Sequence, residues 1–170
     1  MMQTFSRRAL GGGLLALPAI LSGRAEARGV EPLPALYPGT ILVSTSRRRL
    51  YFALPGGQML NYPVAVGKPG KQWFGQRVID GKHVRPAWSP PEDVKRDNPH
   101  LPAVIAGGAA NNPMGERALT ISPGQYAIHG TNRPESIGAY ASYGCIRMHN
   151  RDIIALFDRV AVGAPIIVVR

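Results

Sequence analysis

Cysteine, aromatic residues and acidic residues are all scarce in this sequence. Its 170 residues include one cysteine, Cys145, and 10 acidic residues, and aromatic residues make up 7% of the chain. A single cysteine excludes a disulfide within the chain, so packing must stabilise the fold. The histidines His83, His100 and His149 show no zinc-binding spacing relative to this one cysteine, and we expect no metal site.

A long hydrophobic run is also missing, and the nearest approach to one lies at the N-terminus. Residues 9–21 are apolar, follow the basic segment 6–8 and precede the small-x-small triplet 25–27. This order indicates an export signal over residues 1–27, and the run is too short for a stable membrane span after cleavage near Ala27. The paired arginines fit the twin-arginine route or an ordinary signal, and an uncleaved signal acting as an anchor is the remaining alternative.

Basic residues outnumber acidic ones two to one, and the formal net charge is +10. Such a charge favours polyanionic partners, of which nucleic acid is the first to consider. Export argues against nucleic acid and for the periplasm, where the carboxylate-rich cell wall and anionic lipid headgroups are the acidic partners. For Arg47, Arg48 and Arg49 the alternative is a solvated basic face without a specific contact.

Without the signal, the chain has the length of a single domain. Residues 28–39 are rich in proline and predict a leader that runs along the surface, followed by one domain over residues 40–170. Apolar residues alternate between positions 41 and 54, and a Pro-Gly-Gly turn signal follows them. Residues 40–66 therefore predict three strands of an antiparallel meander.

The rest of the domain divides into an irregular part and a regular part. Residues 67–113 are rich in glycine and proline and predict a long, partly irregular excursion, which is more often functional than decorative. Three further strands are predicted at 117–121, 125–130 and 164–169.

One clear helix is predicted after the cysteine. Asn150 is its expected N-cap and Gly163 its stop. Its core-facing residues are Ile153, Leu156, Phe157 and Val160. The predicted fold is therefore mostly β with this one helix.

The stretch from His129 to Cys145 contains the elements of a nucleophilic site. A cysteine nucleophile needs a base, donors for the developing oxyanion and backbone that approaches the substrate closely. His129 is the candidate base, Gly144 permits a close approach, and Arg147 adds positive potential that favours a thiolate. The alternative is that Cys145 is a small apolar residue in the core.

Several segments around the cysteine resemble one known family. They are His129-Gly130-Thr131-Asn132, Ser136-Ile137-Gly138, and Ser142-Tyr143-Gly144-Cys145-Ile146-Arg147-Met148 followed by Asn150. They resemble the signature of the L,D-transpeptidase catalytic domain of the YkuD type, an HGT/S element followed by [S/T]-H-G-C and a later Asn. The resemblance continues over residues 111–119 and the early strands, so it covers nearly all of the chain after the signal. Tyr143 departs from the commonest form, which has histidine there.

The resemblance implies a fold of β-sandwich-like mixed sheets and a periplasmic enzyme of peptidoglycan metabolism without a metal or organic cofactor. It implies that Cys145 attacks the bond between the diamino acid and the terminal D-alanine of a tetrapeptide stem. D-Alanine leaves, and an amine of another stem or of a wall-anchored protein resolves the thioester. Carbapenems acylate members of this family.

The same resemblance assigns roles to individual residues. It implies that His129 is the base, that the Gly130 carbonyl orients its ring, and that backbone N–H groups form the oxyanion hole. The residues implied for that hole are Tyr143, Gly144 and Cys145. Those implied to bind substrate or organise loops are Arg147, Thr131, Asn132, Ser142 and Asn150.

Two alternatives to the transpeptidase remain open at this stage. One is a carboxypeptidase or hydrolase on the same scaffold, in which water resolves the thioester. The other is a wall-binding module without catalysis, which the basic charge and Tyr143 would favour. For Tyr143 itself we expect that the phenol donates one hydrogen bond in support of the oxyanion hole and substrate, because its pKa of about 10 makes it a poor base.

Overall fold

The computed structural model describes residues 36–170. The predicted export signal and most of the proline-rich leader lie outside the described residues. Between residues 36 and 170, no helix is long and apolar enough to cross a membrane.

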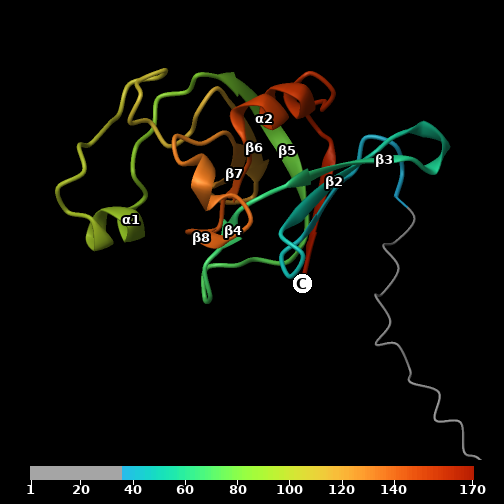
Figure 1. The fold of residues 1–170 in the computed structure, drawn as a ribbon, viewed down its shortest axis with the longest axis horizontal. Helices are drawn as coiled ribbons and strands as arrows, with labels where there is room; N and C mark the ends of the chain where they lie inside the picture. Colours follow the sequence, from blue (N-terminus) through green and yellow to red (C-terminus); the bar gives the residue numbers. More distant parts are fainter. Residues whose placement is uncertain (1–35) are drawn as a thin grey trace, which may run out of the picture. The chain divides into compact units, whose positions relative to one another are not determined.

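The domain is built on an eight-stranded mixed sheet with strand order β3-β2-β1-β10-β5-β6-β7-β9 (Figure 1). Its strands are β1 (Ile41–Ser44), β2 (Arg49–Ala53), β3 (Met59–Pro63), β5 (Gly75–Val84), β6 (Arg117–Ser122), β7 (Tyr126–His129), β9 (Ile146–Arg147) and β10 (Pro165–Val169). A second sheet pairs β4 (Val66–Gly67) with β8 (Tyr140–Ser142). The helices are α1 (Glu92–Asp97) and α2 (Asn150–Phe157), with 3-10 turns at Pro55–Gly57 and Pro134–Ser136. The mostly β prediction with mixed sheets is confirmed.

The first three strands form the predicted antiparallel meander. Ile41 pairs with Phe52 across β1 and β2, and Leu50 pairs with Tyr62 across β2 and β3. The closing strand β10 then inserts beside β1 in parallel and beside β5 in antiparallel orientation. Because β10 lies between the meander and the later strands, the two ends of the domain share one sheet.

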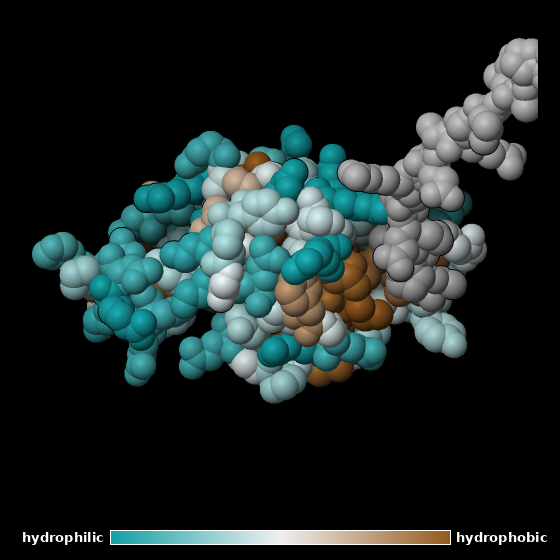
Figure 2. Space-filling model, turned by 90° about the horizontal axis from the view of Figure 1, so that it is seen from below, coloured by the Kyte–Doolittle hydropathy of each residue, from teal (hydrophilic) through white to brown (hydrophobic). Residues whose placement is uncertain are grey.

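A single hydrophobic core unites the sheet and α2. Buried aliphatic residues from the strands pack against Ile153 and Leu156, which are fully buried on α2. These two residues are three positions apart, so they lie on one face of the helix. On the face of the molecule in Figure 2, hydrophilic side chains cover most of the described surface, and a smaller hydrophobic patch is also visible.

Two predictions about α2 need correction. The residue at the N-cap is His149, and Asn150 is the first residue inside the helix. The helix also ends at Phe157, well before Gly163. Asn150 does not cap the helix. Its side chain instead accepts hydrogen bonds from the backbone of Glu116 and Thr131, which are far from it in sequence.

The excursion over residues 67–113 is more regular than predicted. It contains the ten-residue strand β5, which lies between β10 and β6 in the middle of the sheet, and the short helix α1. The strand escaped prediction because its side chains are mostly exposed or half-buried and only Ile79 is buried, so no alternation of apolar residues marks it.

Candidate active site

The pairing of two short strands places the cysteine and the histidine together. His129 is the last residue of β7, and Cys145 directly precedes β9. The two strands are parallel, with His129 opposite Arg147. Because side chains two residues apart along a strand point to the same face, Cys145 and Arg147 project to the side where His129 lies.

These side chains line one cleft of about 720 Å³. Its walls include His129, Cys145 and Arg147 from the sheet, and Trp88 and Leu101 from the excursion. The volume lies within the range of roughly 300–1,000 Å³ that is usual for small-molecule sites. The strand order therefore assembles the candidate nucleophile and base at the floor of a cleft whose other wall is the excursion.

His129 is 4% exposed and held in one orientation. Its Nδ1 donates a hydrogen bond of 2.7 Å to the carbonyl oxygen of Gly130. Burial, reinforced by the positive charge of Arg147, lowers the pKa of His129 to about 4, although the carbonyls of Gly130 and Pro113 act in the opposite direction. The imidazole is therefore neutral at physiological pH and can accept a proton, but with this pKa it is a weaker base than an ordinary histidine.

Burial also has the largest effect on the pKa of the Cys145 thiol. It raises the pKa of Cys145, and this effect outweighs a backbone hydrogen bond from Ala127 and the charge of Arg147, both of which lower the pKa. The positive charge of Arg147 favours the thiolate, as expected, but its effect on the pKa of Cys145 is smaller than that of burial. At rest, a neutral thiol and a neutral imidazole thus line the same cleft.

Gly144 has a conformation and a packing environment that exclude a side chain. Its φ is +120°, and an added Cβ would lie 2.5 Å from Cε1 of Tyr126 and 3.0 Å from the carbonyl oxygen of Lys71. The Gly144 carbonyl in turn accepts a hydrogen bond of 3.0 Å from Nε1 of Trp73, which stacks on Tyr126. Trp73 therefore supports the backbone of the loop between β8 and β9, residues 143–145, called the cysteine loop here.

The Ser142 side chain forms two hydrogen bonds with the backbone of the cysteine loop. It is 1% exposed, and its hydroxyl donates to the carbonyl of Cys145 at 2.5 Å and accepts the Gly144 N–H at 3.1 Å. Ser142 thus organises the loop. Because the Gly144 N–H is already bonded, Tyr143 and Cys145 remain as the candidate backbone donors for an oxyanion.

Arg147 carries an unusual unpartnered polar atom. Its Nε is buried and has no hydrogen-bond partner among the described residues. Burial lowers the pKa of Arg147, and the charge of Arg133, which lines the same cleft, lowers it further. Two guanidinium groups near each other favour an anion, and a carboxylate matches their geometry.

Asn150 connects the loops on either side of His129. Its Oδ1 accepts backbone N–H groups of Glu116 at 3.2 Å and Thr131 at 3.1 Å, and its Nδ2 donates to the Thr131 carbonyl at 3.0 Å. An added Cβ at Gly130 would lie 2.1 Å from Asn150 Oδ1. Thr131 is buried and its Oγ1 accepts the N–H of Arg133, so both Thr131 and Asn150 shape the loop.

The remaining candidates, Asn132 and Tyr143, both line the cleft. Asn132 is exposed and lines the cleft. The phenol of Tyr143 also lines the cleft, but its hydroxyl donates to Asp97 of α1 at 2.5 Å, not toward the candidate oxyanion donors. Sequence reasoning missed this partner because nothing in the irregular excursion marks Asp97 as a neighbour. In residues 36–170, His, Cys, Asp and Glu side chains form no group of three or more that would hold a metal ion.

Comparisons with known proteins point to one family. The profile of the YkuD family, described as the L,D-transpeptidase catalytic domain, matches residues 38–168. The probable L,D-transpeptidase ErfK/SrfK of Escherichia coli K12 is 36% identical over 135 residues, which are 74% of this chain and 42% of that protein. The putative L,D-transpeptidase YkuD of Bacillus subtilis 168 is 33% identical over 162 residues, 92% of this chain and 84% of its own.

A solved structure shares the fold at lower identity. It is L,D-transpeptidase 3 of Mycobacterium tuberculosis in complex with a faropenem-derived adduct, at a TM-score of 0.58 and 15% identity, covering 77% of this chain and 60% of that one. The chain spans about half the length of the first curated relatives that it matches. On the match over residues 38–168 and these relatives, the chain belongs to the YkuD family of L,D-transpeptidase catalytic domains.

Proposed function

We propose that this domain is a peptidoglycan L,D-transpeptidase in which Cys145 is the nucleophile and His129 the general base. The observation that carries the proposal is the parallel pairing of β7 with β9, which brings both side chains to one cleft. Membership of the family supports the same activity. The substrate is a tetrapeptide stem, attacked at the carbonyl carbon between its diamino acid and its terminal D-alanine.

The first half-reaction transfers the acyl group to sulfur. The Sγ of Cys145 forms a bond to the carbonyl carbon while its proton passes to the neutral ring of His129. Since Nδ1 already donates to Gly130, Nε2 is the nitrogen that accepts the proton. Backbone N–H groups of Tyr143 and Cys145 stabilise the oxyanion. When the C–N bond breaks, His129 returns the proton to the departing amine of D-alanine and a thioester remains.

The second half-reaction forms the product amide. An amine of a second stem or of a wall-anchored protein attacks the thioester carbon, its proton passes through His129, and the thiol of Cys145 is restored. Water in place of the amine would give a trimmed stem, which is the hydrolase alternative. The relatives' names favour transfer to an amine.

Charge in the cleft supports a substrate that carries carboxylates. Arg147 presents a buried Nε without a partner, and Arg133 adds a second guanidinium. The terminal carboxylate of the donor stem fits these groups, because a guanidinium binds a carboxylate through parallel hydrogen bonds. Export by the signal over residues 1–27, into the periplasm, completes the proposal, since the substrate lies outside the cytoplasm.

Intact mass after incubation with a carbapenem tests the nucleophile, and the adduct of the Mycobacterium tuberculosis structure makes a β-lactam a suitable probe. We expect a stable adduct on the wild type, none on Cys145→Ala, and acylation roughly 10²- to 10⁴-fold slower in His129→Ala. The exposed His100→Gln serves as the control and should acylate normally.

Release of D-alanine from tetrapeptide stems is the second measurement. Turnover by Cys145→Ala would refute the mechanism. A wild type that neither forms an adduct nor releases D-alanine would favour the non-catalytic wall-binding module instead.

A further inference from the structure

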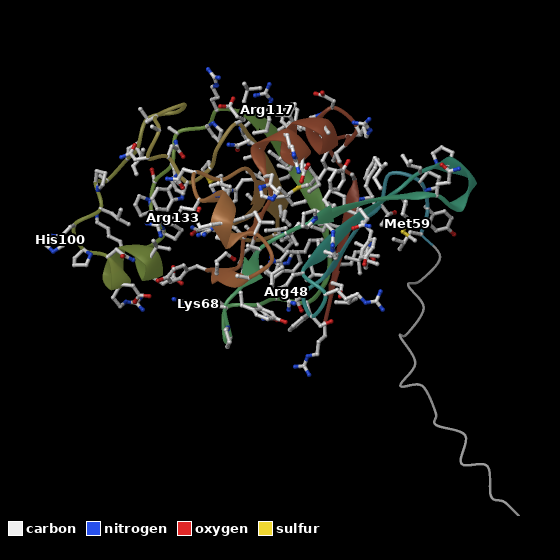
Figure 3. All side chains as sticks on the ribbon, in the orientation of Figure 1. Arg48, Met59, Lys68, His100, Arg117 and Arg133 are labelled. Carbon is white, nitrogen blue, oxygen red and sulfur yellow. The ribbon has the colours of Figure 1, made fainter. Side chains whose placement is uncertain are left out.

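One wall of the cleft is a loop over residues 88–105, called the cap here. Two hydrogen bonds between Trp88 and Ile105, of 2.9 and 2.8 Å, close its base. Trp88, Val94 and Leu101 are among the cap residues that line the cleft. Figure 1 shows α1, inside the cap, apart from the eight-stranded sheet, and His100 lies at the outer edge of the cap in Figure 3.

The helix in the cap has few apolar contacts to hold it, because its one apolar residue, Val94, is only half-buried. It spans six residues and none of them is buried. A helix of this length is not stable in water by itself, so contacts with the rest of the domain must fix its position. Hydrogen bonds from Lys95 N–H to Pro91 and from Asn98 N–H to Val94 hold its own turns together, but they do not hold it against the cleft.

Polar contacts at both ends of α1 hold the helix against the rest of the domain. At its start, Asp93 pairs with Lys71 at 2.7 Å. At its end, Asp97 Oδ2 accepts the hydroxyl of Tyr143 at 2.5 Å and lies 3.6 Å from Nζ of Lys68. Lys68 Nζ also lies 3.8 Å from the centre of the Tyr143 ring, which gives a cation–π contact.

Tyr143, Asp97 and Lys68 thus form a three-residue clasp between the cap and the cysteine loop. The hydrogen bond from Tyr143, followed by the charge of Lys68, lowers the pKa of Asp97 and keeps its carboxylate ionised. In Figure 3, Lys68 lies close to α1. Tyr143 is two residues before Cys145, so the clasp joins the cap to the loop that carries the thiol.

We propose that Tyr143 is a positioning residue that ties the cap to the cysteine loop through Asp97 and Lys68 and thereby sets the width of the cleft for the acyl donor. A histidine at this position lacks the phenol hydroxyl that reaches Asp97 here. The departure of Tyr143 from the family's commonest residue is thus coupled to Asp97 and Lys68 of this chain. The part of the inference that concerns the donor rests on the proposed function, whereas the clasp itself does not.

Amide hydrogen exchange in the full chain measures the clasp directly. The variants are Tyr143→Phe, Asp97→Ala and the double variant. The control is Tyr140→Phe, which removes an exposed phenol that accepts a hydrogen bond from Arg48 outside the cleft. The reporters are the hydrogen-bonded amides of Lys95 and Asn98 in α1.

We expect Tyr143→Phe to speed exchange of these amides roughly three- to tenfold, because one charge-assisted hydrogen bond between exposed groups is lost. Asp97→Ala should speed it by at least as much, because it also loses the ion pair with Lys68. The double variant should exchange no faster than the faster single variant, since both substitutions break the same contact. Tyr140→Phe should match the wild type. Unchanged exchange in Tyr143→Phe and Asp97→Ala would overturn the clasp.

Steady-state kinetics with a tetrapeptide stem measure its consequence for the donor. Asp97→Ala should raise KM roughly three- to tenfold with kcat within about twofold, because it loosens the cleft wall without touching reacting atoms. Asp97→Asn retains an oxygen that accepts the phenol and should recover part of the loss. A fall in kcat for Tyr143→Phe with unchanged amide exchange would show instead that the phenol acts on the reacting groups.

The two proposals fail in different measurements. If the wild type releases no D-alanine, the proposed function fails, while the exchange data still decide the clasp. If the wild type turns over stems but KM is the same in Asp97→Ala, the role of the clasp in donor binding is refuted and the proposed function stands.

Discussion

The low pKa of His129 predicts that acid destabilises this domain through one residue. The pKa is about 4 in the folded state, against an ordinary value of 6.5. Between pH 6.5 and pH 4 the unfolded state therefore binds a proton at His129 that the folded state does not bind. The stability that His129 contributes thus falls as pH falls through this window and changes no further below it. At 1.36 kcal/mol per pKa unit, the loss in free energy of unfolding is about 3 kcal/mol.

Urea unfolding at several pH values between 7 and 4.5 measures this loss, with His129→Gln as the reference. Glutamine does not titrate, so the stability of the wild type relative to this variant should decline as the pH is lowered, toward the full 3 kcal/mol or so. His100→Gln is the matched control, because His100 is exposed in the cap, and its curve should follow the wild type.

The same pKa should appear in the kinetics. If His129 is the base in the free enzyme, the acid limb of kcat/KM for acylation lies near pH 4 and not near 6.5. Equal acid sensitivity of the wild type and His129→Gln, together with an acid limb near 6.5, would refute the view that burial and Arg147 hold this imidazole neutral.

Two further predictions concern the loop and the export signal. Gly144→Ala should lower the midpoint of thermal unfolding and slow carbapenem acylation at least about tenfold, since a positive φ costs roughly 1–3 kcal/mol and the new methyl group meets Tyr126. Gly57 also has a positive φ, of +76°, but nothing within 4 Å of an added Cβ, so Gly57→Ala should leave acylation unchanged. Equal slowing in both variants would contradict the close-contact argument. For the signal, the mature protein should begin at Arg28, and replacing Arg7 and Arg8 with lysine should block export if the twin-arginine route is used. Normal processing of that double variant would exclude this route while leaving export itself intact.

Local sequence patterns determined much of the fold and indicated the residues of the candidate site. The meander, the strands β6, β7 and β10, and α2 each follow from an alternation or a helical spacing that lies within one short segment. The motif segments around His129 and Cys145 pointed to the family, which the profile over residues 38–168 shows.

Strand β5 lay beyond such reasoning, although it is central to the sheet. Its place depends on backbone pairing with β10 and β6, and a strand whose side chains are largely solvated carries no apolar alternation to reveal it. The helix α1 has too few residues and no buried face, so no helical spacing predicts it either.

Which partner each site residue contacts was decided only by the tertiary structure. Asn150 looked like a helix cap, yet its amide bridges Glu116 and Thr131, which are distant in sequence. The phenol of Tyr143 was expected to support the oxyanion hole and substrate, yet its hydroxyl donates to Asp97 in the cap. The sequence by itself determined which chemical groups are present and the local spacing of the motif. Their hydrogen-bond partners and pKa values depend on burial and on neighbours brought in by chain folding, and no local pattern contains that information.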